Sequence, residues 1–126
     1  SPKVAYIRYE DLKVYQLARK LAIEIHKITV AWPKHEQFGG MADQLRRSTK
    51  SINANLAEGQ KKNMSVADKS KFIQIALGSA EESRVWLDFA CELGYMDSKQ
   101  SESYRSQYIE VARMLYALQV SLRKVK

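Results

Sequence analysis

Apolar residues recur at steps of three and four along most of this chain, the spacing that places side chains on one face of an α-helix. In residues 11–30, for example, Val14, Leu21 and Ile25 follow this pattern. No segment shows the strict alternation of apolar and polar residues that is typical of a strand. The pattern therefore predicts an all-α fold with helices at residues 11–30, 40–58, 65–93 and 98–123.

Residues that start and stop helices fall in the gaps between these segments. Asp11, Ser65 and Asp97 are suitable N-terminal caps, because a short polar side chain can accept a hydrogen bond from a free backbone N–H group. Gly59 and Gly94 stand where a helix-terminating glycine is common. Since short links between long amphipathic helices favour antiparallel neighbours, we expect an up-down antiparallel four-helix bundle.

The last two predicted helices carry more than one apolar row. A helix of a monomeric bundle keeps one side in water, so a second row indicates a homo-oligomer, although small bundles also tolerate wide stripes. Gly78 lies mid-helix, where glycine costs about 1 kcal/mol relative to alanine, which predicts close approach of another helix backbone. The expected subunit contacts are Ile73, Leu77, Leu87, Ile109, Tyr116 and Val120.

Positive charge is concentrated in the first half of the chain. The net charge is +7 at pH 7, and residues 1–63 contain 12 basic and 6 acidic side chains, whereas residues 64–126 contain 9 and 8. This asymmetry indicates a surface for a polyanion, with nucleic acid as the expected partner. The alternative is that the positive charge only keeps the protein in solution. The expected nucleic-acid contacts are Lys13, Lys20, Lys27, Arg46, Lys50, Lys61 and Lys62.

The second predicted helix is unusually polar for a bundle helix. Steps of four align Arg47, Ser51 and Asn55 beside its apolar stripe, and buried polar groups need hydrogen-bond partners. We expect Arg47 to pair with Glu81 or Glu82 of the next helix, and Asn55 to bind backbone or a neighbouring helix. The predicted structural network comprises Arg47, Ser51, Asn55, Glu58 and Glu82.

Motifs for catalysis or metal binding are scarce. The two histidines and one cysteine form no zinc spacing, and neither histidine follows a glutamate by three residues as in di-iron bundles. We therefore expect no metal, no cofactor and no enzymatic activity. One alternative remains, because Arg19 and His26 lie two helical turns apart, as in some helical ribonucleases. His26 would then act as general acid or base, and Arg19 would stabilise the charged phosphate.

The length of 126 residues fits a single domain, residues 1–126. Apolar runs are far shorter than the roughly 20 residues that a membrane span requires. Residues 1–4 lack the apolar stretch of a secretory signal, and Cys91 has no disulfide partner within the chain. We expect a cytoplasmic protein without a membrane partner.

Five short motifs occur at residues 9–15, 38–47, 51–59, 78–82 and 93–95, and they read YEDLKVY, FGGMADQLRR, SINANLAEG, GSAEE and LGY. Together they resemble the four-helix-bundle proteins encoded in 23S ribosomal RNA intervening sequences. That family is in turn similar to the accessory variability determinant of diversity-generating retroelements, a basic bundle that binds nucleic acid and a reverse transcriptase. The resemblance implies a barrel-like homopentamer with a charged surface and no known catalysis.

Three functional hypotheses follow from these observations. The leading one is a non-enzymatic, oligomeric protein whose basic faces contact the phosphates of RNA or of an RNA:DNA hybrid, with affinity that falls steeply as salt increases. The second is an interaction scaffold for a reverse transcriptase. The third is a weak helical ribonuclease that uses Arg19 and His26.

Overall fold

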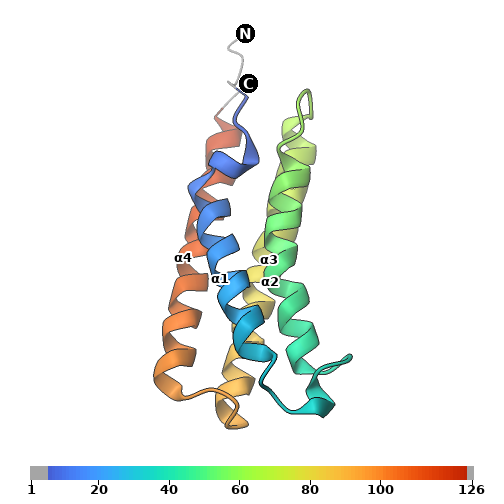
Figure 1. Cartoon of the computed structure of the whole chain (residues 1–126). Helices are drawn as coiled ribbons and strands as arrows, with labels where there is room; N and C mark the ends of the chain where they lie inside the picture. Colours follow the sequence, from blue (N-terminus) through green and yellow to red (C-terminus); the bar gives the residue numbers. More distant parts are fainter. Residues whose placement is uncertain (1–5, 125–126) are drawn as a thin grey trace.

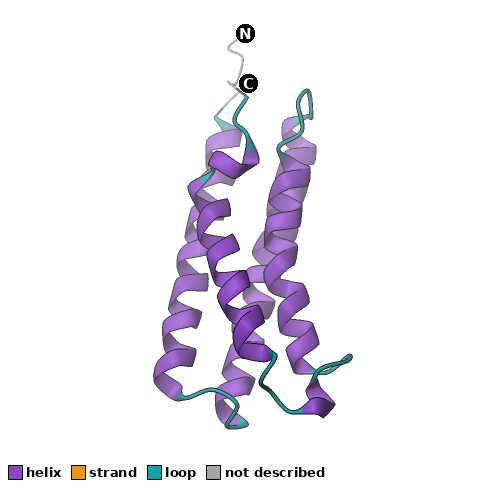
Figure 2. Ribbon diagram, in the orientation of Figure 1, coloured by secondary structure: helices purple, strands orange, loops and turns teal. Residues whose placement is uncertain are grey.

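The computed structural model describes residues 6–124, which form four long α-helices (Figure 1). No strand occurs in this part of the chain (Figure 2), so the predicted all-α class is confirmed. Each predicted helix is present, with boundaries that differ by at most two residues. Residues 1–4, in which no secretory signal was expected, lie outside the described part. The helices are α1 (Lys13–Thr29), α2 (Met41–Gly59), α3 (Val66–Glu92) and α4 (Ser98–Arg123), and the short 3-10 turns are η1 (Tyr9–Asp11) and η2 (Lys34–Glu36).

Figure 1 shows the four helices side by side. The α1–α2 and α3–α4 connections lie at one end of the molecule, and the α2–α3 loop lies at the other. Helix α2 packs against α1 and α3, and α4 packs against α3 and α1. Within residues 6–124, no helix has the length and apolar character needed to cross a bilayer.

Two of the three predicted helix caps are confirmed. Ser65 Oγ accepts a hydrogen bond from the Asp68 N–H at 3.1 Å, and Asp97 Oδ1 accepts one from the Gln100 N–H at 2.7 Å. The prediction for Asp11 is wrong, because this residue ends η1 and α1 starts two residues later without a side-chain cap.

The three glycines that were predicted to matter have different environments. Gly94 has a φ of +80°, which confirms it as a helix-terminating glycine. Gly59 is the last residue of α2 and is buried, without a positive φ; a Cβ here would lie 3.0 Å from Phe72 Cβ, so this glycine permits close packing against α3. Gly78 is exposed, and a Cβ there would meet nothing within 4 Å. The predicted close helix approach at Gly78 is therefore absent within the described chain.

All four helices contribute to one apolar core. Most residues of the predicted apolar stripes lie in it, on one turn after another of α1, α2 and α4. Helix α3 buries residues from both of its predicted rows, because it packs against α2 on one side and α4 on the other. The largest fully buried apolar side chains are Tyr108, Leu21, Ile25, Leu45, Ile52, Leu87, Leu115 and Val111.

Small polar side chains line the seam between α2 and α3. The Ser48 and Ser83 hydroxyls are hydrogen-bonded at 2.8 Å, and Ser79 Oγ donates to Ser51 Oγ at 2.9 Å. Asn55 Nδ2 donates to the Ser51 carbonyl oxygen at 2.8 Å, which confirms that Asn55 binds backbone. Because each hydroxyl is small and satisfied, the two helices pack closely without leaving unpaired polar groups at these positions.

The predicted pairing of Arg47 with α3 is wrong. Arg47 Nε donates to Asp43 Oδ1 at 3.2 Å, one turn earlier on its own helix, and its side chain is 75% exposed. Glu82 accepts a hydrogen bond from Trp86 Nε1 at 3.0 Å, and Glu58 forms an ion pair with Lys61 at 2.9 Å. These charged groups lie on outer helix faces, where each finds a partner within its own helix or the adjoining turn.

Candidate functional site

A groove with a volume of about 310 Å³ lies between α1 and α2. Its lining combines positive charge with apolar surface, and none of the described residues that line it is acidic. Such a lining attracts anions, because no carboxylate is present to neutralise the bases. The basic residues are Arg19, Lys27 and Lys50 together with His26, and the uncharged ones are Tyr15, Ala22, Ile23 and Asn53.

Helical periodicity places these residues together. Tyr15, Arg19 and His26 follow one another at helical steps along α1, beside its buried stripe. Helix α2 supplies Lys50 and Asn53, which are one turn apart. Asn53 Nδ2 donates to the Tyr15 carbonyl oxygen at 3.0 Å, so this side chain links the two helices along the groove.

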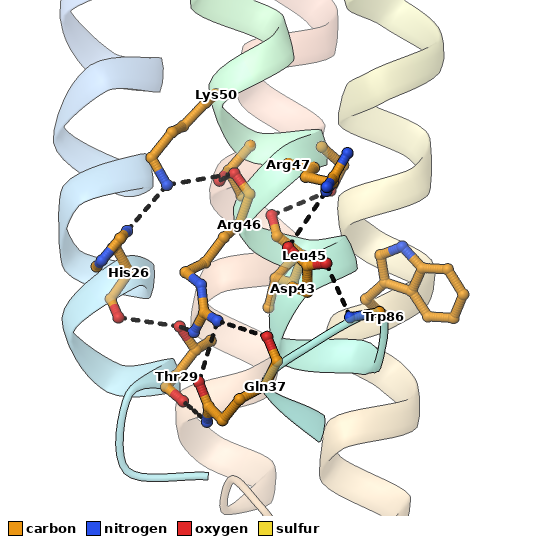
Figure 3. Close-up of polar contacts among 12 residues, drawn as sticks. His26, Thr29, Gln37, Asp43, Leu45, Arg46, Arg47, Lys50 and Trp86 are labelled. Atoms are coloured by element: carbon orange, nitrogen blue, oxygen red, sulfur yellow. Dashed lines mark hydrogen bonds and ion pairs between the residues drawn. The ribbon is translucent and has the colours of Figure 1, made fainter. Parts of the chain in front are cut away.

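Lys50 and His26 face each other across the groove (Figure 3). Lys50 Nζ lies 2.9 Å from His26 Nδ1 and 3.4 Å from the Arg46 carbonyl oxygen. Because an ammonium group only donates hydrogen bonds, the contact requires an unprotonated Nδ1 on His26. Partial burial, followed by the positive charges of Lys50 and Arg46, lowers the pKa of His26 below its ordinary value. Burial and the charge of Arg46 also lower the pKa of Lys50.

Arg46 has a structural role at the base of this site. Its guanidinium donates to Thr29 Oγ1 at 3.0 Å, to the Gln37 carbonyl oxygen at 3.2 Å and to Gln37 Oε1 at 3.0 Å. Figure 3 shows Arg46 pointing away from Lys50 toward these two partners. These hydrogen bonds join α2 to the end of α1 and to the α1–α2 connection. The prediction of Arg46 as a nucleic-acid contact on the surface is therefore wrong.

The structure brings only Lys27 and Lys50 of the seven predicted nucleic-acid contacts into the groove. Lys20 lies 4.0 Å from Glu24, whose carboxylate accepts a hydrogen bond from Tyr104 of α4 at 3.0 Å. Of the predicted row of lysines on α1, only Lys27 therefore lines the groove. Of the other predicted contacts, Lys13 is exposed at the start of α1, Lys61 pairs with Glu58, and Lys62 Nζ lies 5.0 Å from the centre of the Tyr6 ring.

Part of this site, the pair Arg19 and His26, was predicted from the sequence as a candidate catalytic pair. The seven-residue spacing of Arg19 and His26 predicted that they share a helix face, and both line the groove. The apolar part of the lining, Tyr15, Ala22 and Ile23, was not among the predicted site residues. Ile23 is in fact 39% exposed. The signal in the sequence was Ile23, an apolar residue four positions after Arg19 and outside the apolar stripe of this helix.

A second groove, of about 460 Å³, lies between α3 and α4. It includes Leu77, and the exposed side chains of Ile109 and Tyr116, which are 43% and 58% exposed, also line it. Three of the six predicted subunit contacts therefore lie together on one surface. The prediction is wrong for Ile73 and Leu87, which are 4% and 0% exposed in the core of the chain, and Val120 is half-buried on α4.

Residues 6–124 contain no group of three or more His, Cys, Asp or Glu side chains that could hold a metal ion. The two histidines have separate neighbours: His26 contacts Lys50, whereas His35 Nε2 lies 3.4 Å from the Tyr95 hydroxyl. Cys91 is half-buried and free. The α1–α2 groove combines polar, charged and apolar groups from two helices in one concave surface.

Comparisons with known proteins identify the family. The family model described as 23S rRNA-intervening sequence protein matches residues 10–117. A crystal structure of a protein of unknown function from the S23 ribosomal protein family of Bacteroides thetaiotaomicron is similar, with a TM-score of 0.73 and 28% sequence identity, over 84% of this chain and 97% of that one. Curated protein sequences gave no match. The chain therefore belongs to the 23S rRNA-intervening sequence protein family.

Proposed function

We propose that this protein is a non-enzymatic, oligomeric nucleic-acid-binding protein that contacts the phosphates of RNA or of an RNA:DNA hybrid. The observation that carries the proposal is the α1–α2 groove, where Arg19, Lys27 and Lys50 gather beside His26 with no acidic residue in the lining. Elsewhere several bases are paired within the chain, as Arg47 is with Asp43. Unpaired cations in a concave site suit a polyanion, because binding releases condensed counterions.

The proposal includes assembly into a homopentamer, in which up-down antiparallel bundles associate through the α3–α4 groove. Ile109 and Tyr116 support it, because they are large, exposed and apolar and lie in one concave surface. A ring of subunits presents several copies of the basic groove to one nucleic acid. Individually weak contacts then combine, since each later contact becomes intramolecular.

The test compares two variants that lose the same charge. Arg19→Gln/Lys27→Gln/Lys50→Gln removes the groove cations, whereas Lys99→Gln/Arg123→Gln/Lys124→Gln removes three exposed cations of the α4 region. We expect the groove variant to weaken RNA binding at least about tenfold and to reduce the salt slope by about 2, or about 0.7 per lost phosphate contact. The control variant should bind within about threefold of the wild type.

Fluorescence anisotropy with labelled RNA at several salt concentrations measures both quantities. Equal losses in the two variants would show that total charge, and not the groove, determines binding. Wild-type affinity that does not change between low and physiological salt would contradict the proposal directly.

An interaction scaffold for a reverse transcriptase is the second candidate. It is supported by the α3–α4 groove, which offers apolar surface around Tyr116 to a protein partner. Binding of a purified reverse transcriptase that persists after nuclease treatment would favour this candidate over the first. A complex that dissociates when nucleic acid is digested would instead indicate that the nucleic acid joins the two proteins.

A weak helical ribonuclease is the third candidate, and it is supported by the position of Arg19 and His26 in one groove. His26 would act as the general acid or base and Arg19 would stabilise the phosphate charge. RNA cleavage that is unchanged in His26→Ala would eliminate this candidate.

A further inference from the structure

We propose that the α1–α2 groove holds one unpaired nucleotide of a single-stranded nucleic acid, with its base against Tyr15 and Ile23 and its phosphate between Lys50 and His26. This inference rests on the proposed function and makes it more specific. A base-paired helix presents mainly its backbone to a protein surface, whereas a single strand presents base and phosphate side by side.

The lining of the groove matches both parts of a nucleotide. Phosphate contacts alone need only cations, yet this groove also contains an aromatic ring and an exposed branched side chain, Tyr15 and Ile23. Buried Ala22, whose side chain is small, also lines the groove. A volume of about 310 Å³ lies at the lower end of the range for small-ligand sites.

The Lys50–His26 contact determines how the phosphate enters. In the unbound protein Lys50 donates to Nδ1 of a neutral His26, over 2.9 Å. A phosphate oxygen is a stronger acceptor than the imidazole nitrogen, so it replaces His26 as the partner of Lys50. His26 can then take up a proton from solvent and donate to the same phosphate. No covalent bond is made or broken in this step.

The charges around His26 make this protonation depend on the anion. Arg19 and Lys27 from α1, and Lys50 and Arg46 from α2, are the charged groups that surround it. Burial, followed by the charges of Lys50 and Arg46, lowers the pKa of His26, so that it stays neutral in the unbound protein until an anion arrives. Binding is therefore coupled to proton uptake, and affinity should increase as the pH decreases. The phosphodiester itself stays ionised over this range.

The first test removes apolar surface without changing charge. Ile23→Ser alters the groove, and Ile75→Ser is the control, because Ile75 is 51% exposed on α3. We expect Ile23→Ser to weaken binding of a labelled ten-nucleotide oligouridylate about fivefold, since base contacts contribute alongside charge. Binding of a ten-base-pair RNA duplex should stay within about twofold, and Ile75→Ser should match the wild type with both probes.

The second test measures proton uptake. Between pH 8 and pH 6, wild-type affinity for the oligouridylate should increase at least about threefold, because the complex contains one more proton. His26→Gln should lose this dependence, whereas His35→Gln, which changes the other histidine, should keep it. Circular dichroism of each variant at both pH values establishes that the fold is intact.

Failure of the inference can be distinguished from failure of the proposed function. If Ile23→Ser binds the single strand as the wild type does, or if His26→Gln keeps the pH dependence, the nucleotide site is overturned. The phosphate-binding function stands in that case, provided that loss of the groove cations still weakens binding. If the wild type binds neither probe at low salt, both proposals are overturned.

Discussion

Two adjacent arginines of α2 show how local geometry assigns different roles to the same residue type. Arg46 is half-buried and donates to Thr29 and Gln37, whereas Arg47 is exposed and pairs with Asp43. A rotation of about 100° per residue separates the two side chains around the helix. The hydrogen bonds of Arg46 join separate parts of the chain, and the ion pair of Arg47 lies in water, where such pairs contribute little.

We predict that Arg46→Met lowers the free energy of unfolding by about 2 kcal/mol, because hydrogen bonds from a charged group in a half-buried position contribute about 1.5–3 kcal/mol. Arg47→Met is the matched control and should leave the stability unchanged within experimental error. Urea denaturation followed by circular dichroism measures both variants. Equal destabilisation by the two substitutions would contradict the structural role of Arg46.

At the scale of the elements, α3 packs against α2 on one side and α4 on the other. Its buried residues span both predicted rows, and Gly78 lies on the outer side, where a Cβ would meet nothing within 4 Å in the described part of the chain. The α2–α3 seam is closed instead by Gly59 against Phe72 and by the paired hydroxyls of Ser48 and Ser83. Small residues thus permit close packing where they face the seam, and only weaken the helix where they face outward.

We predict that Gly78→Ala raises the free energy of unfolding by about 1 kcal/mol, because alanine favours the helical backbone and a Cβ has space there. Gly94→Ala is the contrasting variant. It should lower stability by about 1 kcal/mol, since φ is +80° and the left-handed conformation is unfavourable for alanine. Thermal and urea denaturation at low protein concentration measure both. A destabilising Gly78→Ala would mean that its surroundings are occupied.

At the scale of the whole molecule, two grooves on the described part of the chain differ in chemistry. The α1–α2 groove is basic, and the α3–α4 groove exposes Ile109 and Tyr116 beside Arg84 and Arg113. One surface therefore suits a polyanion, and the other suits a second copy of the chain. The proposed association through the α3–α4 groove would leave the α1–α2 groove available to a polyanion, so we assign binding and association to different helix pairs.

We predict that Ile109→Lys prevents association, because burying an additional charge in the α3–α4 groove without a partner is costly. The fold should remain intact, since Ile109 is 43% exposed. Sedimentation equilibrium should give a multiple of 14.5 kDa for the wild type and about one chain mass for the variant. Val66→Lys, at a 37% exposed position of α3, is the control. A monomeric wild type at high micromolar concentration would contradict the assembly.

The sequence by itself determined the helices and most of their ends. Their periodicity, the caps at Ser65 and Asp97 and the glycine at position 94 are local features, which depend on a few neighbouring residues and are readable without a fold. The shared face of Arg19 and His26 was also predictable, because helical geometry fixes it.

Tertiary structure alone decided which helices meet and which side chains each contact covers. Ile73 and Leu87 lie in the core, and Arg46 donates to Thr29 and Gln37, because of how the helices pack. This packing also brought Lys50 of α2 to His26 of α1, which are 24 residues apart in the chain. Amphipathic periodicity specifies that a face is buried but not which partner buries it, so sites formed between two helices follow from packing.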